Sequence, residues 1–178
     1  MTGPYRGKRV VDLAILAVVA VPAVVLAVPC AVAVKLTSPG PVLFRQERIG
    51  RNGRPFELLK FRTMTTGPNA LIPDQADITR VGAVLRRLSL DELPQLLNVA
   101  RGEMSIVGPR PTLAYQVDRY TDTQRRRLCV NPGVTGWAQL QGRNEIPWAR
   151  RIEYDLEYID TLQSPARDVS ILIRSVLA

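Results

Sequence analysis

The chain of 178 residues contains no histidine at all. This excludes histidine general bases, Ser-His-Asp triads and metal sites built on imidazole. The chain also has only two cysteines, Cys30 and Cys129, which lie far apart, so a disulfide is not expected and a reducing compartment fits. A metal bound here would depend on oxygen ligands, which favours Mg²⁺, with Mn²⁺ as the alternative.

Acidic residues are few relative to basic ones: 16 against 24, which gives a formal net charge of +8. This balance indicates an anionic partner, either nucleic acid, an anionic bilayer or a phosphorylated substrate. The sequence contains no zinc-finger spacing, no RRM-like aromatic motif and no separate basic arm. We therefore expect no nucleic-acid partner, and a membrane surface or a phosphorylated substrate instead.

Residues 13–34 lack any charge, and basic residues stand on both sides of them, at Arg6, Lys8 and Arg9 and at Lys35. Such a run has about the length needed to cross a hydrocarbon core of ~30 Å. A cleaved signal peptide, a single membrane span and a re-entrant helix are the three interpretations. The run is long for the apolar region of a signal peptide.

Pro22 and Pro29 favour the re-entrant interpretation over a straight span. Each proline removes a backbone hydrogen bond and bends a helix, and at a spacing of seven residues both lie on nearly the same face. Positive charge at both ends favours keeping both ends in the cytoplasm. We predict a membrane helix-break-helix over residues 1–37, with Asp12 paired to Lys8, and a cytosolic catalytic domain over residues 38–178.

The second part of the chain predicts a helix-rich, mixed α/β fold. Residues 42–47 and 55–61 read as strands, and Asn52-Gly53 between them is a strong hairpin signal. Residues 65–77 read as a polar loop that could act as a lid. Helices are expected over residues 78–88, 90–99, 116–129, 145–162 and 167–177, the fourth of them starting around Pro147. No repeat, low-complexity tract or domain linker interrupts them.

Two adjacent carboxylates, Asp91 and Glu92, follow two arginines, Arg86 and Arg87, at a predicted helix start. A carboxylate pair can hold a divalent metal and supply a nucleophile, and arginines bind phosphate. A purely structural interpretation is a capping box, with Ser89 at the N-cap and Glu92 at the third helical position. Asp91 is compatible with both interpretations, because a helix N-terminus keeps a carboxylate ionised.

Further basic residues are candidates for substrate contact. Lys60 and Arg62 alternate along the second strand and share one face, which predicts either substrate contact or a charged surface towards the membrane. Arg110 stands between two prolines, so its position is rigid and favours a phosphate or carboxylate contact. The run 125–127 of three arginines is expected to face lipid headgroups or solvent.

With these features in place, the chain resembles the monotopic phosphoglycosyl transferases, the small single-domain bacterial sugar transferases. The resemblance runs from about Lys8 to Leu172. The matching segments are Lys8-Arg9…Asp12, Ser38-Pro-Gly-Pro-Val42, Phe44-Arg-Gln-Glu-Arg-Ile-Gly50, Lys60-Phe-Arg-Thr-Met64, Leu88-Ser-Leu-Asp-Glu-Leu-Pro-Gln95, Gly102-Glu-Met-Ser-Ile-Val-Gly-Pro-Arg-Pro111, Pro132-Gly-Val-Thr-Gly-Trp-Ala-Gln139 and Gly142-Arg-Asn144. The number and order of these segments make the resemblance specific.

The resemblance implies an enzyme at the cytoplasmic face of the bacterial inner membrane. It would transfer a sugar-1-phosphate from a UDP-sugar to polyprenol phosphate and release UMP. In that scheme Asp91 attacks the sugar-linked phosphate to form an aspartyl-phosphosugar, while Asp91 and Glu92 bind Mg²⁺. The sugar, the glycan pathway and the oligomeric state stay open.

The resemblance also implies substrate-binding roles for further residues. It makes Arg86 a phosphate contact, the alternative being a solvated basic helix face. Arg143 and Asn144 belong to a block near the family's active site and are expected to bind nucleotide or phosphate. Asp155 matches an acidic position of the family's late helix, the alternative being an ion pair with Arg151.

Overall fold

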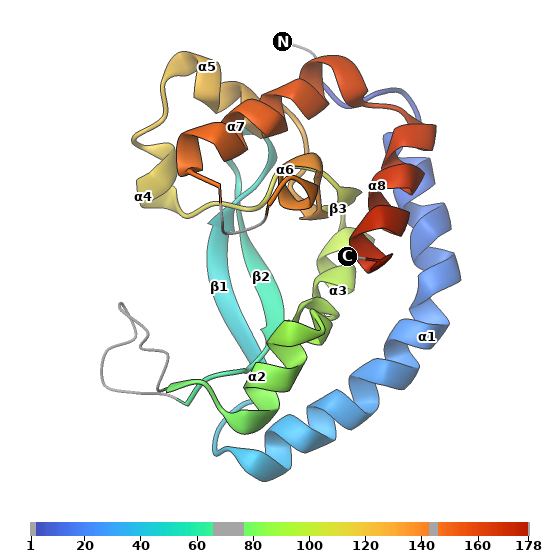
Figure 1. The fold of residues 1–178 in the computed structure, drawn as a ribbon, viewed down its shortest axis with the longest axis vertical. Coiled ribbons are helices and arrows are strands. Elements are labelled where there is room, and N and C mark those ends of the chain that lie inside the picture. Colours follow the sequence, from blue (N-terminus) through green and yellow to red (C-terminus); the bar gives the residue numbers. More distant parts are fainter. Residues whose placement is uncertain (1–2, 66–76, 143–145, 178) are drawn as a thin grey trace.

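The structure is a computed structural model that describes residues 3–65, 77–142 and 146–177. A long helix, α1 (Lys8–Thr37), runs along one side of a small mixed domain (Figure 1). The helix-rich α/β class predicted from the sequence is confirmed, and the described residues form two small two-stranded sheets among the helices. Most of the predicted loop 65–77 lies outside the described residues.

The first sheet is the predicted hairpin of β1 (Leu43–Ile49) and β2 (Pro55–Phe61), which pair antiparallel from Leu43–Phe61 to Ile49–Pro55. A short 3₁₀ turn, η1 (Arg51–Gly53), connects them. Asn52 and Gly53 both have positive φ, at 57° and 76°, as the Asn-Gly signal predicts for a primed turn.

The apolar segment forms a single helix of 30 residues that contains Pro22 and Pro29. It bends about midway along its length (Figure 1), in line with the added bends expected of two prolines on one face. Side chains in the middle of the helix are exposed: Val18, Val21 and Val25 are 77%, 72% and 65% exposed. By length and composition the helix could cross a membrane.

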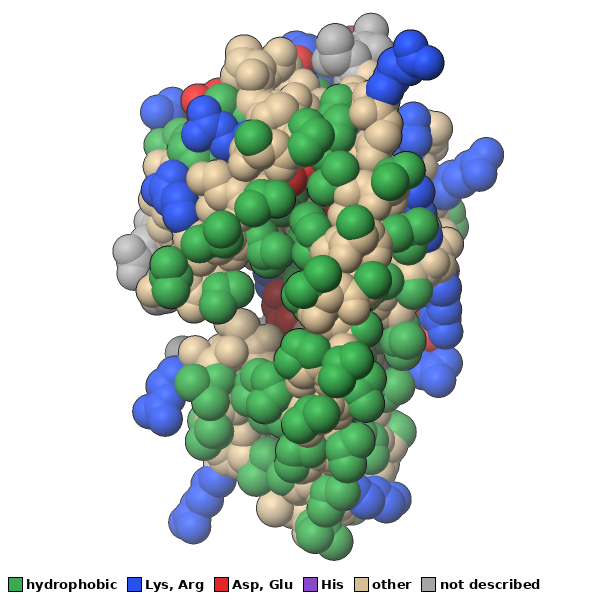
Figure 2. All heavy atoms as spheres, turned by 90° about the vertical axis from the view of Figure 1, so that its right-hand side faces the viewer, with side chains coloured by type: hydrophobic (Ala, Val, Ile, Leu, Met, Phe, Trp, Pro, Cys, Tyr) green, Lys and Arg blue, Asp and Glu red, His purple; other side chains and the backbone are tan. Residues whose placement is uncertain are grey.

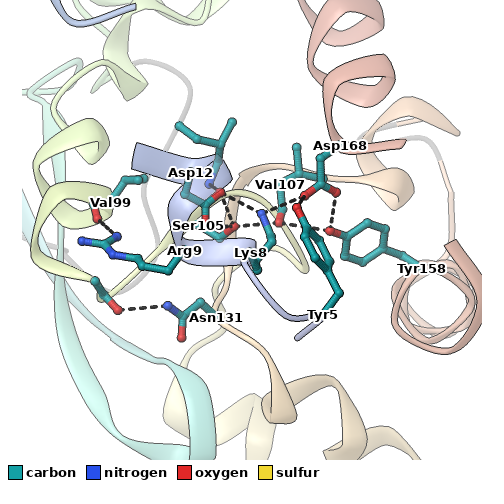
Figure 3. Close-up of polar contacts among 12 residues, drawn as sticks. Tyr5, Lys8, Arg9, Asp12, Val99, Ser105, Val107, Asn131, Tyr158 and Asp168 are labelled. Atoms are coloured by element: carbon teal, nitrogen blue, oxygen red, sulfur yellow. Dashed lines mark hydrogen bonds and ion pairs between the residues drawn. The ribbon is translucent and has the colours of Figure 1, made fainter. Parts of the chain in front are cut away.

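A buried polar cluster fixes the N-terminal end of α1 to the domain (Figure 3). Lys8 forms ion pairs with Asp12 at 2.7 Å and with Asp168 at 3.0 Å, which confirms the predicted Lys8–Asp12 pair. The hydroxyl of Ser105 donates to Asp12 at 2.9 Å, and that of Tyr158 to Asp168 at 2.6 Å. These partners come from segments about 90 to 160 residues away.

The C-terminal end of α1 is fixed by a different set of contacts. Ser38, the C-cap residue, has an extended backbone, and its hydroxyl donates to the carbonyl of Val34 at 3.2 Å. Cys30 and Val34 pack with Phe61 and Leu85 in a small apolar cluster. Both ends of α1 are therefore attached to the same domain.

The remaining elements build the body of the domain. The helices are α2 (Arg80–Arg87), α3 (Gln95–Arg101), α4 (Ala114–Val117), α5 (Asp122–Arg125), α6 (Trp137–Leu140), α7 (Trp148–Glu157) and α8 (Pro165–Leu177). The 3₁₀ turns are η3 (Leu90–Glu92) and η4 (Arg126–Cys129), and a π-helical turn, η5 (Tyr158–Leu162), follows α7. Strands β3 (Ser105–Val107) and β4 (Gly133–Thr135) pair parallel. The main core lies between these elements and comprises Leu58, Val99, Met104, Ile106, Val107, Val130, Tyr158, Ile159 and Ile171.

Two predicted helices are wrong in extent. The one over 90–99 is divided into η3 and α3, because Pro94 cannot donate a helical hydrogen bond. The one over 116–129 is three short pieces, α4, α5 and η4. Thr121 starts α5 with a capping box that closes on Gln124, so the chain restarts instead of continuing. The helix expected to start around Pro147 and to end at Leu162 is confirmed, because α7 begins at Trp148 after Pro147 as its N-cap and η5 continues it to Leu162.

Candidate active site

Asp91 and Glu92 lie together in η3, the short turn between α2 and α3. Ser89, directly before this turn, has a left-handed backbone with φ 56° and makes no side-chain cap bond. The capping-box interpretation of Ser89 and Glu92 is therefore wrong, because an N-cap residue needs an extended backbone. The left-handed residue turns the chain so that both carboxylates follow within one turn.

Lys60 of β2 reaches both carboxylates. Its Nζ lies 2.6 Å from Oε1 of Glu92 and 3.8 Å from Oδ2 of Asp91. The three side chains are only 11% to 19% exposed, so water screens their interaction weakly. Lys60 is thus located in the predicted site.

Arg110 joins the same group from a third segment. Its Nη2 donates to Oε1 of Glu92 at 3.1 Å, so this oxygen accepts from Lys60 and Arg110 together. Arg110 stands between Pro109 and Pro111, directly after β3, and its side chain is 48% exposed. The hairpin, η3 and the turn after β3 therefore meet at Glu92, with one guanidinium open to a ligand.

Arg86 lies at the edge of the site. Its Nε donates to the hydroxyl of Thr63 at 2.9 Å, and its charge acts on Asp91. The approach of α2 to this segment requires Gly82, because a Cβ there would lie 2.0 Å from the carbonyl oxygen of Thr63. Because Gly82 has no side chain, α2 can approach this segment closely, and Arg86 then lies near the carboxylate pair.

The pKa values of the two carboxyl groups are shifted in opposite directions. Burial raises the pKa of Asp91, and the charge of Glu92 adds to this, while Lys60 and Arg86 oppose it. Burial alone would also raise the pKa of Glu92, but Arg110 and Lys60 outweigh it and lower that pKa. Glu92 is thus held as an anion between two cations, and Asp91 keeps its oxygens less fully paired.

A divalent cation fits this pair through its donor chemistry. Among the described residues no group of three or more cysteine or carboxylate side chains forms a metal cluster. Mg²⁺, however, is usually held by one or two carboxylates together with substrate phosphates. The two carboxylates already share one cation, the Lys60 ammonium, which indicates that the pair can accommodate positive charge.

Other predicted site residues lie elsewhere. Arg62 is 5% exposed and donates from Nη2 to the carbonyl and hydroxyl oxygens of Ser38, at 2.7 and 2.9 Å. This location indicates that Arg62 fixes the end of α1, and its substrate contact stays a prediction. Arg143 and Asn144 lie outside the described residues.

Asp155 is 3% exposed and pairs with Arg127, not with Arg151 as its structural alternative supposed. The local helix pair that was its structural alternative is not found, because Arg127 occupies the carboxylate, and the site role stays a prediction. Arg127 is equally buried, so the expectation that all of 125–127 faces lipid or solvent is wrong for this residue. Nothing in the spacing of three arginines distinguishes the buried one, since only the tertiary fold brings Asp155 to it.

The fold and site define a helix-rich α/β protein with a membrane-length apolar helix and a carboxylate pair surrounded by basic side chains. The family model described as bacterial sugar transferase matches residues 4–178. The chain belongs to the bacterial sugar transferase family.

Several curated proteins are similar to this chain. An uncharacterised sugar transferase, EpsL, of Bacillus subtilis (strain 168) is 50% identical, over 71% of this chain and 64% of its own length. A UDP-glucose:undecaprenyl-phosphate glucose-1-phosphate transferase of Caulobacter vibrioides is 44% identical, over 95% of this chain and 68% of its own length. One of the same name in Escherichia coli (strain K12) is 48% identical, over 72% of this chain but only 31% of its own length.

Proposed function

We propose that this protein is a phosphoglycosyl transferase that moves a sugar-1-phosphate from a UDP-sugar to polyprenol phosphate. The products are a polyprenyl-diphosphate-sugar and UMP. The names of the Caulobacter and Escherichia relatives support this substrate pair. The observation that carries the proposal is the unequal pair: Lys60 and Arg110 hold Glu92 closely, whereas Asp91 beside it has only Lys60, at 3.8 Å, as an ion-pair partner among the described residues.

The reaction proceeds in two displacements at one phosphorus atom. A carboxylate oxygen of Asp91 attacks the phosphorus that bears the sugar, and the bond from that phosphorus to UMP breaks, with UMP leaving as the anion. A phosphate oxygen of polyprenol phosphate then attacks the same phosphorus and releases the Asp91 carboxylate. Covalent catalysis lets two anionic substrates use one site in turn.

Basic side chains supply the charge that such a transfer requires. Arg110, half exposed and held at Glu92, is positioned to contact the phosphate being transferred. Lys60 and Arg86 both favour the ionised, nucleophilic form of Asp91. A cluster of fixed cations stabilises the negative charge that builds up on the transferring phosphoryl group.

The pair of Asp91 and Glu92 would hold Mg²⁺, with Mn²⁺ as the alternative. The metal would neutralise phosphate charge and orient the diphosphate of the donor. Glu92, whose pKa lies below its usual range, stays ionised for this purpose, and Lys60 would keep a carboxylate oxygen in place next to it.

The helix α1 would be a re-entrant membrane helix. A helix of 30 residues is ~45 Å long, more than the thickness of a hydrocarbon core. Its two ends contact one domain through Lys8 and Ser38, and its exposed apolar middle lies between them. The arrangement is consistent with both ends at the cytoplasmic face of the bacterial inner membrane, where membrane lipids would surround the middle.

A test of the function combines a substrate panel with one substitution. The full chain in lipid nanodiscs is given Mg²⁺, polyprenol phosphate and each of several UDP-sugars, and UMP release is measured. We expect release with at least one sugar, and loss of more than about 1,000-fold in Asp91→Asn because the nucleophile is gone. Equal UMP release by Asp91→Asn, or none from wild type with any UDP-sugar, would leave a non-catalytic membrane scaffold as the better account.

A further inference from the structure

Arg127 and Asp155 form an ion pair inside the domain, away from the carboxylate pair of η3. Each side chain is only 3% exposed. Arg127 belongs to η4 and Asp155 to α7, so the pair joins two segments that are separate in sequence. A buried ion pair often stabilises a fold no better than an apolar pair of the same volume. Stability alone therefore gives no reason for it to be here.

The turn that carries Arg110 is held at every backbone oxygen. Four consecutive carbonyls, at residues 109–112, accept hydrogen bonds from four separate donors. The donors and distances are Gly133 N to Pro109 O (2.8 Å), Arg127 Nη2 to Arg110 O (3.2 Å), Arg48 Nη1 to Pro111 O (3.3 Å) and Ile49 N to Thr112 O (2.9 Å). Arg127 thus binds the backbone of the residue whose side chain reaches Glu92.

Several groups fix the guanidinium of Arg127 in that position. Its Nη1 donates to the hydroxyl of Tyr120, and its Nη2 is shared between Asp155 and the Arg110 carbonyl. The rings of Tyr120 and Trp148 lie with their centroids 5.6 and 5.5 Å from its central carbon. Among the described residues its Nε is buried without a hydrogen-bond partner. The planar guanidinium is thus oriented so that Nη2 reaches both the Arg110 carbonyl and the Asp155 carboxylate, and this orientation leaves Nε unpaired within the described part of the chain.

We propose that Arg127 is a positioning residue for the transfer reaction and that Asp155 supplies the charge that keeps it there. Arg127 holds the 109–112 turn, and the turn presents the Arg110 guanidinium to Glu92 and to the substrate phosphate. The inference rests on the proposed function of the Asp91–Glu92 site. A shift of about 1 Å in a substrate-positioning group can lower a rate about 100-fold.

The chain offers a matched control in the adjacent pair of Arg126 and Asp160. This pair has the same chemistry, but its side chains are 37% and 35% exposed. Arg127→Met and Asp155→Asn are compared with Arg126→Met and Asp160→Asn in the full chain in nanodiscs. We expect kcat/KM for UMP release to fall about 10- to 100-fold in the first two variants, mainly through kcat, and to change less than about 2-fold in the controls.

A double-substitution cycle distinguishes positioning from general support of the fold. Arg127→Met is introduced into wild type and into Arg110→Gln. If Arg127 acts through Arg110, its removal should lower kcat/KM less than about 3-fold once Arg110 is gone. An equal fold-loss in both backgrounds would overturn the proposal. Because wild type is active in the same assay, that result would leave the proposed function intact, whereas an inactive wild type would remove both.

Amide hydrogen exchange does not depend on activity. It can therefore be measured even in a variant whose activity falls because it is less stable. Arg127→Lys keeps the charge but loses the planar fork, and Asp155→Asn keeps the shape of the carboxylate. Both should speed amide exchange in the peptide spanning residues 105–117 and leave the peptide that holds Asp91 unchanged. Unchanged exchange over 105–117 in both variants would also overturn the proposal.

Discussion

Adjacent residues in one turn can serve different chemistry when their surroundings differ. Glu92 accepts from Lys60 and Arg110 through the same oxygen, whereas Asp91 has Lys60 at 3.8 Å. The pKa values of the two carboxyl groups are accordingly shifted in opposite directions. Such a divergence separates a group that binds cations from one that reacts.

Ser89 adopts an unfavourable left-handed backbone conformation in this turn. A left-handed conformation disfavours a residue with a Cβ by about 1 to 2 kcal/mol, and glycine avoids this. We expect Ser89→Gly to unfold at a higher temperature than wild type and Ser89→Val at a lower one. Thermal melting in detergent measures both. A lower melting temperature for Ser89→Gly than for Ser89→Val would contradict the role given to this backbone.

The raised pKa of Asp155 predicts that the stability of the fold depends on pH. Burial raises its pKa to about 6, although Arg127 and Arg151 oppose the shift. The pKa of an unfolded aspartate is ~3.9. Between this pH and about pH 6, the folded chain therefore holds a proton that the unfolded chain has lost. The contribution of Asp155 to the free energy of unfolding should therefore decrease by up to roughly 3 kcal/mol as pH rises from about 4 to about 6.

The test compares melting temperatures at pH 4 and pH 7 for wild type, Asp155→Asn and Asp160→Asn. In Asp155→Asn no carboxyl group titrates at this position, so the pH-dependent contribution of Asp155 is absent. Asp155→Asn should lose less stability between pH 4 and pH 7 than wild type, and Asp160→Asn should follow wild type. The same pH difference in all three proteins would show that Asp155 keeps an ordinary pKa.

At the scale of elements, the attachment of α1 explains why Arg62 is buried. Its guanidinium donates to the oxygens of Ser38 at the end of the helix, while Lys60, two residues earlier, reaches the active site. Alternation along a strand predicts a shared face. It does not show that one side chain reaches the carboxylate pair and the other the end of α1.

Arg62→Met should therefore destabilise the fold without acting on substrate binding. Loss of the guanidinium leaves the Ser38 carbonyl without this donor, and we expect a loss of about 2 to 4 kcal/mol. Arg45→Met, on the neighbouring strand with a side chain 63% exposed, is the control and should be close to neutral. Melting temperature and the KM for UDP-sugar measure the two effects. A raised KM with an unchanged melting temperature would support the predicted substrate contact instead.

The elements that could be predicted are those with strong local signals. The hairpin follows from the Asn52-Gly53 pair, and the apolar helix follows from the uncharged run 13–34. The contacts of Lys60, Glu92 and Arg110 could not be derived from spacing, because three separate segments bring them together. Composition suggested the chemistry of Asp91 and Glu92, whereas the burial of Arg127 depends on how α7 packs.

At the scale of the whole molecule, apolar side chains gather on the side that carries α1 and α8 (Figure 2). The exposed members include Val18 and Val21 on α1 and Ile173 and Val176 on α8. A hollow with acidic side chains at its bottom opens beside this surface (Figure 2). Under the proposed function, a lipid-linked acceptor at this surface would keep its chain in the apolar region beside the hollow.

Labelling both ends of α1 tests the topology that this shape suggests. Single cysteines replace Arg6 and Thr37 in a background without Cys30 and Cys129, and a membrane-impermeant thiol reagent is added to either side of the vesicles. Both positions should react from the cytoplasmic side only, because both ends of the helix contact one domain. Labelling of the two positions from opposite sides would mean a plain membrane span.

Intact-peptide mass spectrometry tests the central claim most directly. The full chain is incubated with its UDP-sugar and Mg²⁺ but no polyprenol phosphate, and is then digested. The peptide holding Asp91 should carry the added mass of one phosphosugar, which disappears when the acceptor is supplied and never forms in Asp91→Asn. An unmodified Asp91 peptide, in a preparation that still turns over when both substrates are present, would contradict the account.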